Sequence, residues 1–275
     1  MKAQPAEHVD LTRLGRYRLL DRIGGGATSI VYAAHDEAMD RAVAVKMIVA
    51  DLENERETRE RFYREAKVTA QLLHPNIVTV LDIGEDQGHP YIVMELLDGW
   101  ALGEYLRQAA DLPLATKIAL IVQLCRGLQA AHDCGVVHRD IKPSNLFVSR
   151  DGGLKILDFG LVRLQASTLT ASGQILGTPE FMSPEQALGQ QVDARSDIFS
   201  ASAVSYLILA GRAPFTGRDL RQTLNALIAE DPAPIQETDA PPKLFRVLLK
   251  GLAKIPADRY QSCREMLVDL QGEGA

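Results

Sequence analysis

One polar stretch, His138–Asn145, most constrains how this chain can fold. It reads His-Arg-Asp-Ile-Lys-Pro-Ser-Asn and separates the apolar runs Cys134–Val137 and Leu146–Val148. Pro143 cannot continue a helix, and the serine and asparagine after it favour turns. The stretch is therefore predicted to be a loop that brings an acid, a lysine and an amide within reach of one reacting group.

The side chains that matter in this loop are Asp140, Lys142 and Asn145. Taken alone, the tripeptide His-Arg-Asp is explained more simply by a hydrogen-bonded core histidine and an aspartate at a helix cap or on the surface. The order of the motifs is more informative, because Asp158-Phe159-Gly160 follows after an intervening hairpin.

That hairpin is predicted from the turn sequence Ser149–Gly153, which would pair Phe147-Val148 with Leu154–Leu157. The pairing would present Asn145 and Asp158 to the same cleft. Both side chains offer hard oxygen ligands, which suit Mg²⁺. An aspartate that caps a turn is the alternative for Asp158.

Near the start of the chain, a strand over Tyr17–Ile23 is predicted to return through a glycine-rich hairpin, Gly24–Tyr32. Glycines let backbone N–H groups approach a polyphosphate without obstruction by side chains. The strand-to-strand setting differs from the strand-to-helix setting of dinucleotide and P-loop sites. An ordinary flexible turn remains the alternative.

Lys46 is the charged residue of an otherwise apolar predicted strand, Arg41–Val49. An amphipathic helix is predicted over Leu52–Leu73, with Glu65 on the side of its apolar residues. Lys46 either needs a partner such as this carboxylate or lies on an edge strand and reaches solvent.

The ordered set resembles the catalytic and metal-binding segments of protein kinases. Three segments are most similar to bacterial eukaryotic-like (Hanks-type) serine/threonine kinases, namely Arg64-Glu65-Ala66, His74–Val78 and Gly177–Gln186. The resemblance covers about Tyr17–Leu270. It implies an α+β, bilobal protein-kinase-like fold with a small five-stranded antiparallel sheet plus one helix and a larger, mainly helical lobe. The implied parts are an N-terminal extension (1–16), an ATP-binding N-lobe (17–97) and a C-lobe with the catalytic loop, activation segment and substrate site (98–275).

The resemblance implies ATP as the nucleotide. In the family the strand lysine holds the α and β phosphates and pairs with the helix glutamate, so Lys46 is matched with Glu65. The glycine loop matches G-x-G-x-x-G-x-V at Gly24, Gly26 and Val31, but Ser29 replaces the third glycine.

For the adenine, the resemblance makes Met94 the gatekeeper and gives hydrogen bonds to the backbone groups of Glu95 and Leu97. The apolar residues expected around the nucleotide are Ile23, Val31, Ala44 and Phe147. The alternative is that Val31, Ala44 and Phe147 are simply residues of the hydrophobic core.

The mechanism implied is in-line transfer of the ATP γ-phosphoryl group to a serine or threonine hydroxyl of a protein. Asp140 would orient the hydroxyl and take its proton, and Lys142 would offset charge on the moving phosphoryl group. Asn145 and Asp158 would hold Mg²⁺, with Mn²⁺ as an alternative ion. Lys142 after Asp140, with Thr178 in the following segment, indicates Ser/Thr rather than Tyr acceptors.

The polar segment Leu161–Leu176 resembles an activation segment, and Thr170 and Ser172 are the expected autophosphorylation sites. A phosphate there would neutralise three arginines that converge in the family: Arg61, Arg139 and Arg163. A polar surface loop with incidental hydroxyls is the alternative.

Two structural anchors are also implied by the resemblance. Asp197 would brace the catalytic loop, and Arg259 would form a buried pair with Glu185. Ser183 stands where alanine is usual in the Ala-Pro-Glu motif of the family.

The net charge of −6 argues against a surface that coats nucleic acid, which would be basic. The three cysteines lack C-x-x-C spacing and are expected to pack as small hydrophobic residues in a reducing cytoplasm. No apolar run approaches the ~20 residues that span a bilayer. The expected partners are ATP and protein substrates, with a homodimer for autophosphorylation as an open option.

Two other functions compete with a protein kinase. A pseudokinase scaffold would usually have lost Lys46, Asp140 or Asp158, and all three are present. A small-molecule kinase of related fold would lack the segment from Gly177-Thr178-Pro179 to Ser183-Pro184-Glu185 that seats a peptide.

Overall fold

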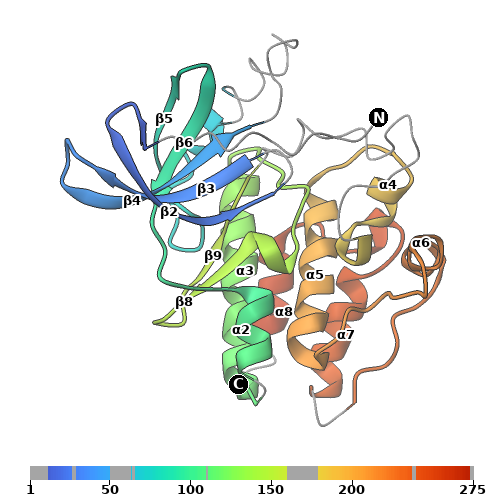
Figure 1. The fold of residues 1–275 in the computed structure, drawn as a ribbon. Helices are drawn as coiled ribbons and strands as arrows, with labels where there is room; N and C mark the ends of the chain where they lie inside the picture. The colour runs from blue at the N-terminus through green and yellow to red at the C-terminus, as the bar shows by residue number, and fades with distance from the viewer. Residues whose placement is uncertain are drawn as a thin grey trace. The chain divides into compact units, whose positions relative to one another are not determined.

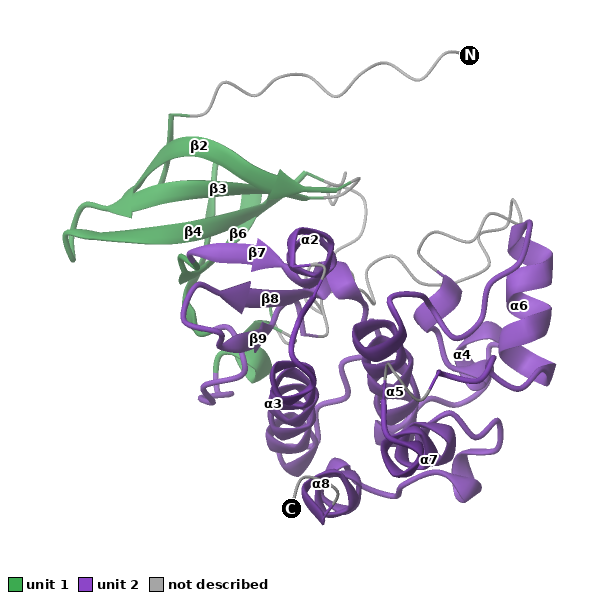
Figure 2. Cartoon of the chain, turned by 90° about the horizontal axis from the view of Figure 1, so that it is seen from below, with its two compact units in different colours: residues 1–70, 79–97 green, residues 71–78, 98–275 purple. Residues whose placement is uncertain are grey.

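The computed structural model describes residues 12–26, 29–49, 63, 66–109, 111–159, 179–236 and 240–272. The chain divides into two compact units, coloured separately in Figure 2. Unit 1 is Met1–Ala70 with Thr79–Leu97, and unit 2 is Gln71–Val78 with Asp98–Ala275. Each unit has its own hydrophobic core.

Unit 1 is built on one antiparallel sheet with the strand order β1-β2-β3-β4-β6-β5. Its strands are β1 (Arg13–Leu14), β2 (Tyr17–Gly25), β3 (Ser29–Asp36), β4 (Arg41–Ile48), β5 (Val80–Asp86) and β6 (His89–Glu95). β4 pairs with β3 on one side and β6 on the other, and every residue of 43–48 is buried. Lys46 is therefore on a central strand, and the alternative of an edge-strand lysine in solvent is wrong.

The sheet has six strands where the resemblance predicted five. The additional strand, β1, lies within the expected N-terminal extension and pairs with β2. Leu14 is fully buried, and the Gly15 N–H donates to the Asp86 carboxylate at 2.7 Å, which ties the β1–β2 turn to β5. A strand of two residues is too short to show the alternation by which strands are predicted.

The helix expected over Leu52–Leu73 lies mostly outside the described residues, and Glu65 is among those not described. Residues 66–69 are helical, and a turn follows at 70–71. The apolar run Ile77–Ile83 predicts a strand that starts at Ile77, but β5 starts at Val80. Ile77 is fully buried in unit 2, where it forms a parallel bridge with Ile156.

Unit 2 is mainly helical (Figure 1). Its longer helices are α2 (Leu102–Gln108), α3 (Leu114–Asp133), α5 (Ala194–Ala210), α6 (Leu220–Ala229), α7 (Pro242–Gly251) and α8 (Cys263–Gly272). α3 contacts α5 and α8, and α5 contacts α7. A small sheet of β7 (Gly99–Ala101), β8 (Leu146–Ser149) and β9 (Leu154–Ile156) also contacts α3, through β9. The hairpin predicted from Ser149–Gly153 is confirmed by the pairing of β8 with β9.

α3 is the one helix within the described ranges that is long and apolar enough to cross a membrane. In this fold it is the central helix of the core of unit 2, because its fully buried residues follow the spacing of one helix face: Leu120, Ile121, Leu124, Cys125, Gly127, Leu128 and Ala131. Cys125 and Cys263 are buried as expected, but Cys134 is exposed, because it lies just beyond the end of α3.

The ends of α5 follow from its capping residues. The helix begins at Ala194, three residues before Asp197, because Asp193 accepts the Arg195 N–H at 2.8 Å. It ends at Ala210, and the next residue, Gly211, has φ of 69°, the left-handed conformation that glycine adopts most readily. This placement puts Asp197 in the first turn, facing the catalytic loop.

Candidate functional site

The predicted loop His138–Asn145 exists and ends in a 3₁₀ turn, η1 (Pro143–Asn145), which leads into β8. The amide nitrogen of Asn145 donates to the Asp140 carbonyl and to Asp140 Oδ2, both at 2.8 Å. Lys142 Nζ lies 2.8 Å from the same Oδ2. The structure therefore brings together the three side chains singled out in the sequence.

His138 connects the loop to the segment after β9. Its ring is fully buried, Nε2 lies 2.7 Å from the Leu157 carbonyl, and Nδ1 accepts the Asp140 N–H at 3.2 Å. These partners assign the proton to Nε2. The ring also meets Phe159 edge-on, with 4.7 Å between centroids. His138 is thus the hydrogen-bonded core histidine of the simpler alternative, and it also holds the loop in place.

Two non-glycine residues at the site have left-handed backbones: Arg139 with φ of 69° and Asp158 with φ of 55°. Such conformations concentrate at functional sites and persist only where neighbours hold them. Asp158 follows β9, and the Leu157 N–H donates to the Asn145 carbonyl at 2.9 Å. Asn145 and Asp158 are thus joined through the backbone.

Asp197 braces the loop from α5. Its carboxylate accepts the N–H groups of His138 and Arg139, each at 2.7 Å, and is 1% exposed. His132 Nε2 lies 2.8 Å from Asp197 Oδ2, and Cys263 Sγ lies 3.9 Å from Nδ1 of the same ring. The sequence analysis missed His132 and Cys263, since nothing in their local sequences links them to Asp197.

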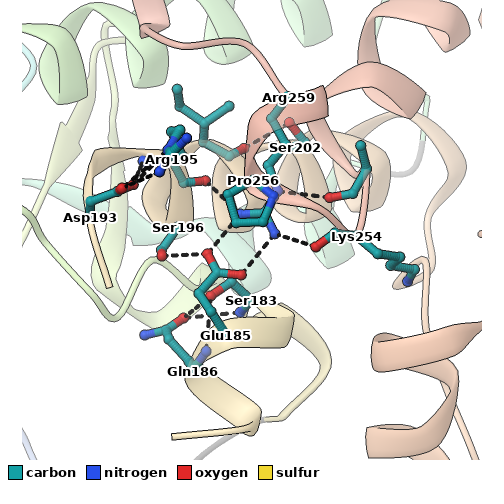
Figure 3. A network of polar contacts seen from close by, with 12 residues as sticks. Ser183, Glu185, Gln186, Asp193, Arg195, Ser196, Ser202, Lys254, Pro256 and Arg259 are labelled. Atoms are coloured by element: carbon teal, nitrogen blue, oxygen red, sulfur yellow. Dashed lines mark hydrogen bonds and ion pairs between the residues drawn. The ribbon is translucent and has the colours of Figure 1, made fainter. Parts of the chain in front are cut away.

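The expected pair of Glu185 and Arg259 is buried and bidentate (Figure 3), with nitrogen–oxygen distances of 2.7 and 2.8 Å. Burial would raise the pKa of Glu185, but hydrogen bonds from Arg259 and Ser196 outweigh it and lower that pKa below its usual value. Glu185 belongs to the short helix α4 (Pro184–Ala187). The pair therefore anchors α4 to unit 2.

α4 carries a second connection that the sequence analysis missed. Ser183 and Gln186 form a capping box at its start. Gln186 Nε2 also donates to the Arg139 carbonyl at 2.6 Å. The capping box could have been read from the Ser-x-x-Gln spacing, but the contact with Arg139 joins residues 47 positions apart.

Of the residues expected to bind a nucleotide in unit 1, Ala44, Lys46 and Met94 are buried. Lys46 lies opposite Val31 on β3 and Ile92 on β6. Ile23 is about half exposed, at 52%.

The other members of this set occupy the glycine hairpin, the chain after β6, and unit 2. Gly24 belongs to β2, and the Gly26 N–H donates to the Ser29 carbonyl at 2.8 Å. The Glu95 N–H donates to the Thr79 carbonyl at 3.1 Å, so this backbone group is not available to an adenine. Leu97 is half-buried, and Phe147, also half-buried, lies on β8 of unit 2.

Several expected site residues lie outside the described residues: Arg61, Glu65, Gly160, Arg163, Thr170 and Ser172. In the described part of the chain, no three histidine, cysteine, aspartate or glutamate side chains cluster as a metal site. The expected donors are one carboxylate, Asp158, and the amide oxygen of Asn145, whose amide nitrogen is already used. This small set of hard oxygens fits Mg²⁺, which keeps several waters and takes further ligands from phosphates.

Residues 17–268 match the protein kinase domain family. A probable serine/threonine-protein kinase of Corynebacterium efficiens is 39% identical over 269 residues, which cover 93% of this chain and 41% of the relative. The serine/threonine-protein kinase PknB of Mycolicibacterium smegmatis is 40% identical over 264 residues, covering 93% of this chain and 42% of that protein. The chain thus spans about two-fifths of the length of these curated relatives.

Solved structures give the same result for the fold. The kinase domain of Mycobacterium tuberculosis PknI superposes with a TM-score of 0.73 at 26% identity, covering 98% of this chain and 100% of that chain. A mutant of that domain gives a TM-score of 0.75 at 27% identity and covers 100% of both chains. The bilobal α+β kinase fold is therefore confirmed, with six strands in the sheet of unit 1.

Proposed function

The chain belongs to the protein kinase domain family, and from this premise we propose that it transfers the γ-phosphoryl group of ATP to serine and threonine hydroxyls of proteins. One observation carries the proposal: Lys142 and Asn145 both hold one carboxylate oxygen of Asp140. A carboxylate held in this way is oriented before substrate arrives, and phosphoryl transfer depends mainly on such positioning.

Asp140 is the proposed general base. Its Oδ2 is occupied by Lys142 and Asn145, so Oδ1 is the oxygen that would accept the proton of the substrate hydroxyl. The side chains of Asp140 and Lys142 are each 22% exposed, which allows a substrate to reach them. Lys142 would shift towards the transferred phosphoryl group as negative charge develops there.

Asp158 and the amide oxygen of Asn145 are the proposed magnesium ligands, with Mn²⁺ as a substitute. When bound, the ion would bridge nucleotide phosphates and neutralise their charge. Lys46, paired with Glu65, would position the α and β phosphates under the loop of Gly24 and Gly26.

The adenine would bind at the end of β6. Met94 would line the pocket, and the Glu95 carbonyl and the Leu97 backbone would hydrogen-bond the base. Apolar contacts are assigned to Ile23, Val31, Ala44 and Phe147.

The proposal includes autophosphorylation at Thr170 and Ser172, within a homodimer if one copy acts on another. A cytoplasmic location agrees with it, because the three cysteines are free thiols and ATP is available there.

The test is phosphoryl transfer from labelled ATP and Mg²⁺ to a generic basic protein. The wild type should transfer phosphate, and Asp140→Asn should lose about 100-fold or more of the rate while staying folded. Asp133→Asn, an exposed aspartate on α3, is the matched control and should behave as wild type. Near-normal turnover by Asp140→Asn would show that the base is assigned wrongly.

The same reaction decides the rest of the proposal. Phosphate mapped to Thr170 or Ser172 by mass spectrometry would support autophosphorylation there, and phosphate confined to other residues would contradict it. A wild type that binds ATP but transfers nothing would instead be a pseudokinase.

A further inference from the structure

The peptide group between Arg139 and Asp140 is held at both ends. Its carbonyl, on Arg139, accepts from Gln186 Nε2 at 2.6 Å, and its N–H, on Asp140, donates to His138 Nδ1 at 3.2 Å. Because a peptide group is planar and rigid, two hydrogen bonds on opposite ends fix its orientation. With this plane fixed, the Asp140 side chain can be re-aimed through the backbone only by rotation about the N–Cα bond of Asp140.

This peptide needs holding because of the conformation before it. Arg139 has φ of 69°, a left-handed conformation that is unfavourable for a residue other than glycine. Asp197 accepts the N–H of Arg139 at 2.7 Å, and its carboxylate has no donor to offer the carbonyl of that residue. Gln186 is the residue that holds the carbonyl side.

Gln186 is itself fixed in one orientation. Its Oε1 accepts the Ser183 N–H at 3.0 Å and lies 3.2 Å from Ser183 Oγ, while its own N–H donates to that Oγ at 3.4 Å (Figure 3). With Oε1 facing two donors, the amide nitrogen is the end that faces Arg139. Glu185, the preceding residue, anchors α4 through Arg259.

We infer that Gln186 is a positioning residue for the reaction proposed above: its amide nitrogen holds the Arg139 carbonyl and thereby sets the orientation of Asp140. The inference rests on the proposed function, since it concerns the proposed base. Gln186 has no contact with substrate in this role and acts through the backbone of the catalytic loop.

The competing interpretation is that Gln186 only caps α4. Gln186→Glu separates the two interpretations, because glutamate serves in a capping box as well as glutamine does. The carboxylate can still accept from Ser183, but it cannot donate to Arg139 and would place negative charge against its carbonyl. If Gln186 only caps α4, Gln186→Glu should keep wild-type activity. If Gln186 positions the catalytic loop, Gln186→Glu should lose activity.

The experiment compares wild type, Gln186→Glu and Gln190→Glu by steady-state kinetics with a generic protein substrate. Gln190 is exposed four residues further on and gives the same change of charge. Gln186→Glu should lower kcat roughly 10- to 100-fold, the scale of a small misplacement of a catalytic group, with little change in KM for ATP. Gln190→Glu should match wild type. A wild-type kcat for Gln186→Glu would overturn the inference.

A second measurement does not depend on activity. In hydrogen exchange, the amides of residues 136–142 should exchange faster in Gln186→Glu than in wild type, while the unfolding temperature stays close to wild type. Unchanged exchange there would also overturn the inference. If the wild type transfers no phosphate, the proposed function fails, and the exchange result still decides the role of Gln186. Should Gln186→Glu melt early, both measurements are made well below its melting temperature, where the variant is folded and its capping box is kept.

Discussion

Arg259 uses every hydrogen-bond donor that an arginine has. Nε donates to the Ala253 carbonyl, Nη1 to Glu185 and the Arg195 carbonyl, and Nη2 to Glu185 and the Lys254 carbonyl. Five N–H groups thus meet five acceptors, which is what a guanidinium needs when its side chain is fully buried. A lysine has three donors and cannot replace it.

The change Arg259→Ala leaves the Glu185 carboxylate buried, with Ser196 as its one remaining side-chain donor among the described residues. The free energy of unfolding should fall by roughly 3–5 kcal/mol, the scale for removing one partner of a buried pair. Urea denaturation measures the loss. Arg264→Ala removes an exposed arginine paired with Asp133 and should change the free energy by about 1 kcal/mol or less. Equal midpoints for Arg259→Ala and wild type would contradict a stabilising pair.

At the scale of elements, the end of α6 depends on a residue far along the chain. Lys254 Nζ donates to the Leu227 carbonyl at 2.6 Å and to the Ala226 carbonyl at 3.4 Å, both in the last turn of α6. It also lies 3.6 Å from the centroid of the Phe215 ring. Burial lowers the pKa of Lys254 from 10.5 to about 8.

This pKa predicts how the stability that Lys254 provides changes with pH. The folded pKa is below the unfolded one, so above pH 8 the unfolded state binds more protons, and the stability that the group contributes rises with pH up to about 10.5. Lys254→Met removes the group. The variant should therefore lose more unfolding free energy relative to wild type at about pH 9.5 than at about pH 7.

Lys250→Met is the matched control for this measurement, since Lys250 is an exposed lysine on α7. The difference between Lys250→Met and wild type should be the same at both pH values. A Lys254→Met difference that shrinks at the higher pH would contradict a lowered pKa in the folded protein.

The elements differ in how well the sequence predicts them. The β8–β9 hairpin and α3 are predicted because a turn sequence and a helical spacing of apolar residues are local signals. The strand β1 and the position of Ile77 in unit 2 are not predicted by local signals. Both depend on contacts with distant residues: Asp86 for the β1–β2 turn, and Ile156 for Ile77. Local signals cannot record such contacts.

The same distinction holds for the site in the whole molecule. Asp140, Lys142 and Asn145 lie within six residues, so their order in the sequence already brings them together. Gln186 lies 47 residues from Arg139, and only the folded unit 2 shows their contact. The resemblance to protein kinases identified Asp197 as a brace of the loop and Arg259 as the partner of Glu185. The spacing of these residues in the sequence does not indicate either contact.

The proposed function also makes a prediction for the stability of the whole molecule, since it assigns Lys46 to the nucleotide phosphates and Asp158 to the metal ion. A ligand that binds only the native state raises the free energy of unfolding, by about 2.7 kcal/mol at 100 times its Kd. ATP with Mg²⁺ should therefore raise the unfolding temperature of the wild type. Lys46→Met in unit 1 and Asp158→Asn in unit 2 should each reduce this shift.

Chelation separates the two proposed roles. When EDTA removes Mg²⁺, any remaining shift by ATP should be the same in Asp158→Asn and wild type, because the ligand role of Asp158 requires the ion. Lys46→Met should reduce the shift with or without Mg²⁺, since its contact is with phosphate directly. Lys67→Met, an exposed lysine in unit 1, should behave as wild type throughout. A full shift for Asp158→Asn in the presence of Mg²⁺ would remove Asp158 from the metal site.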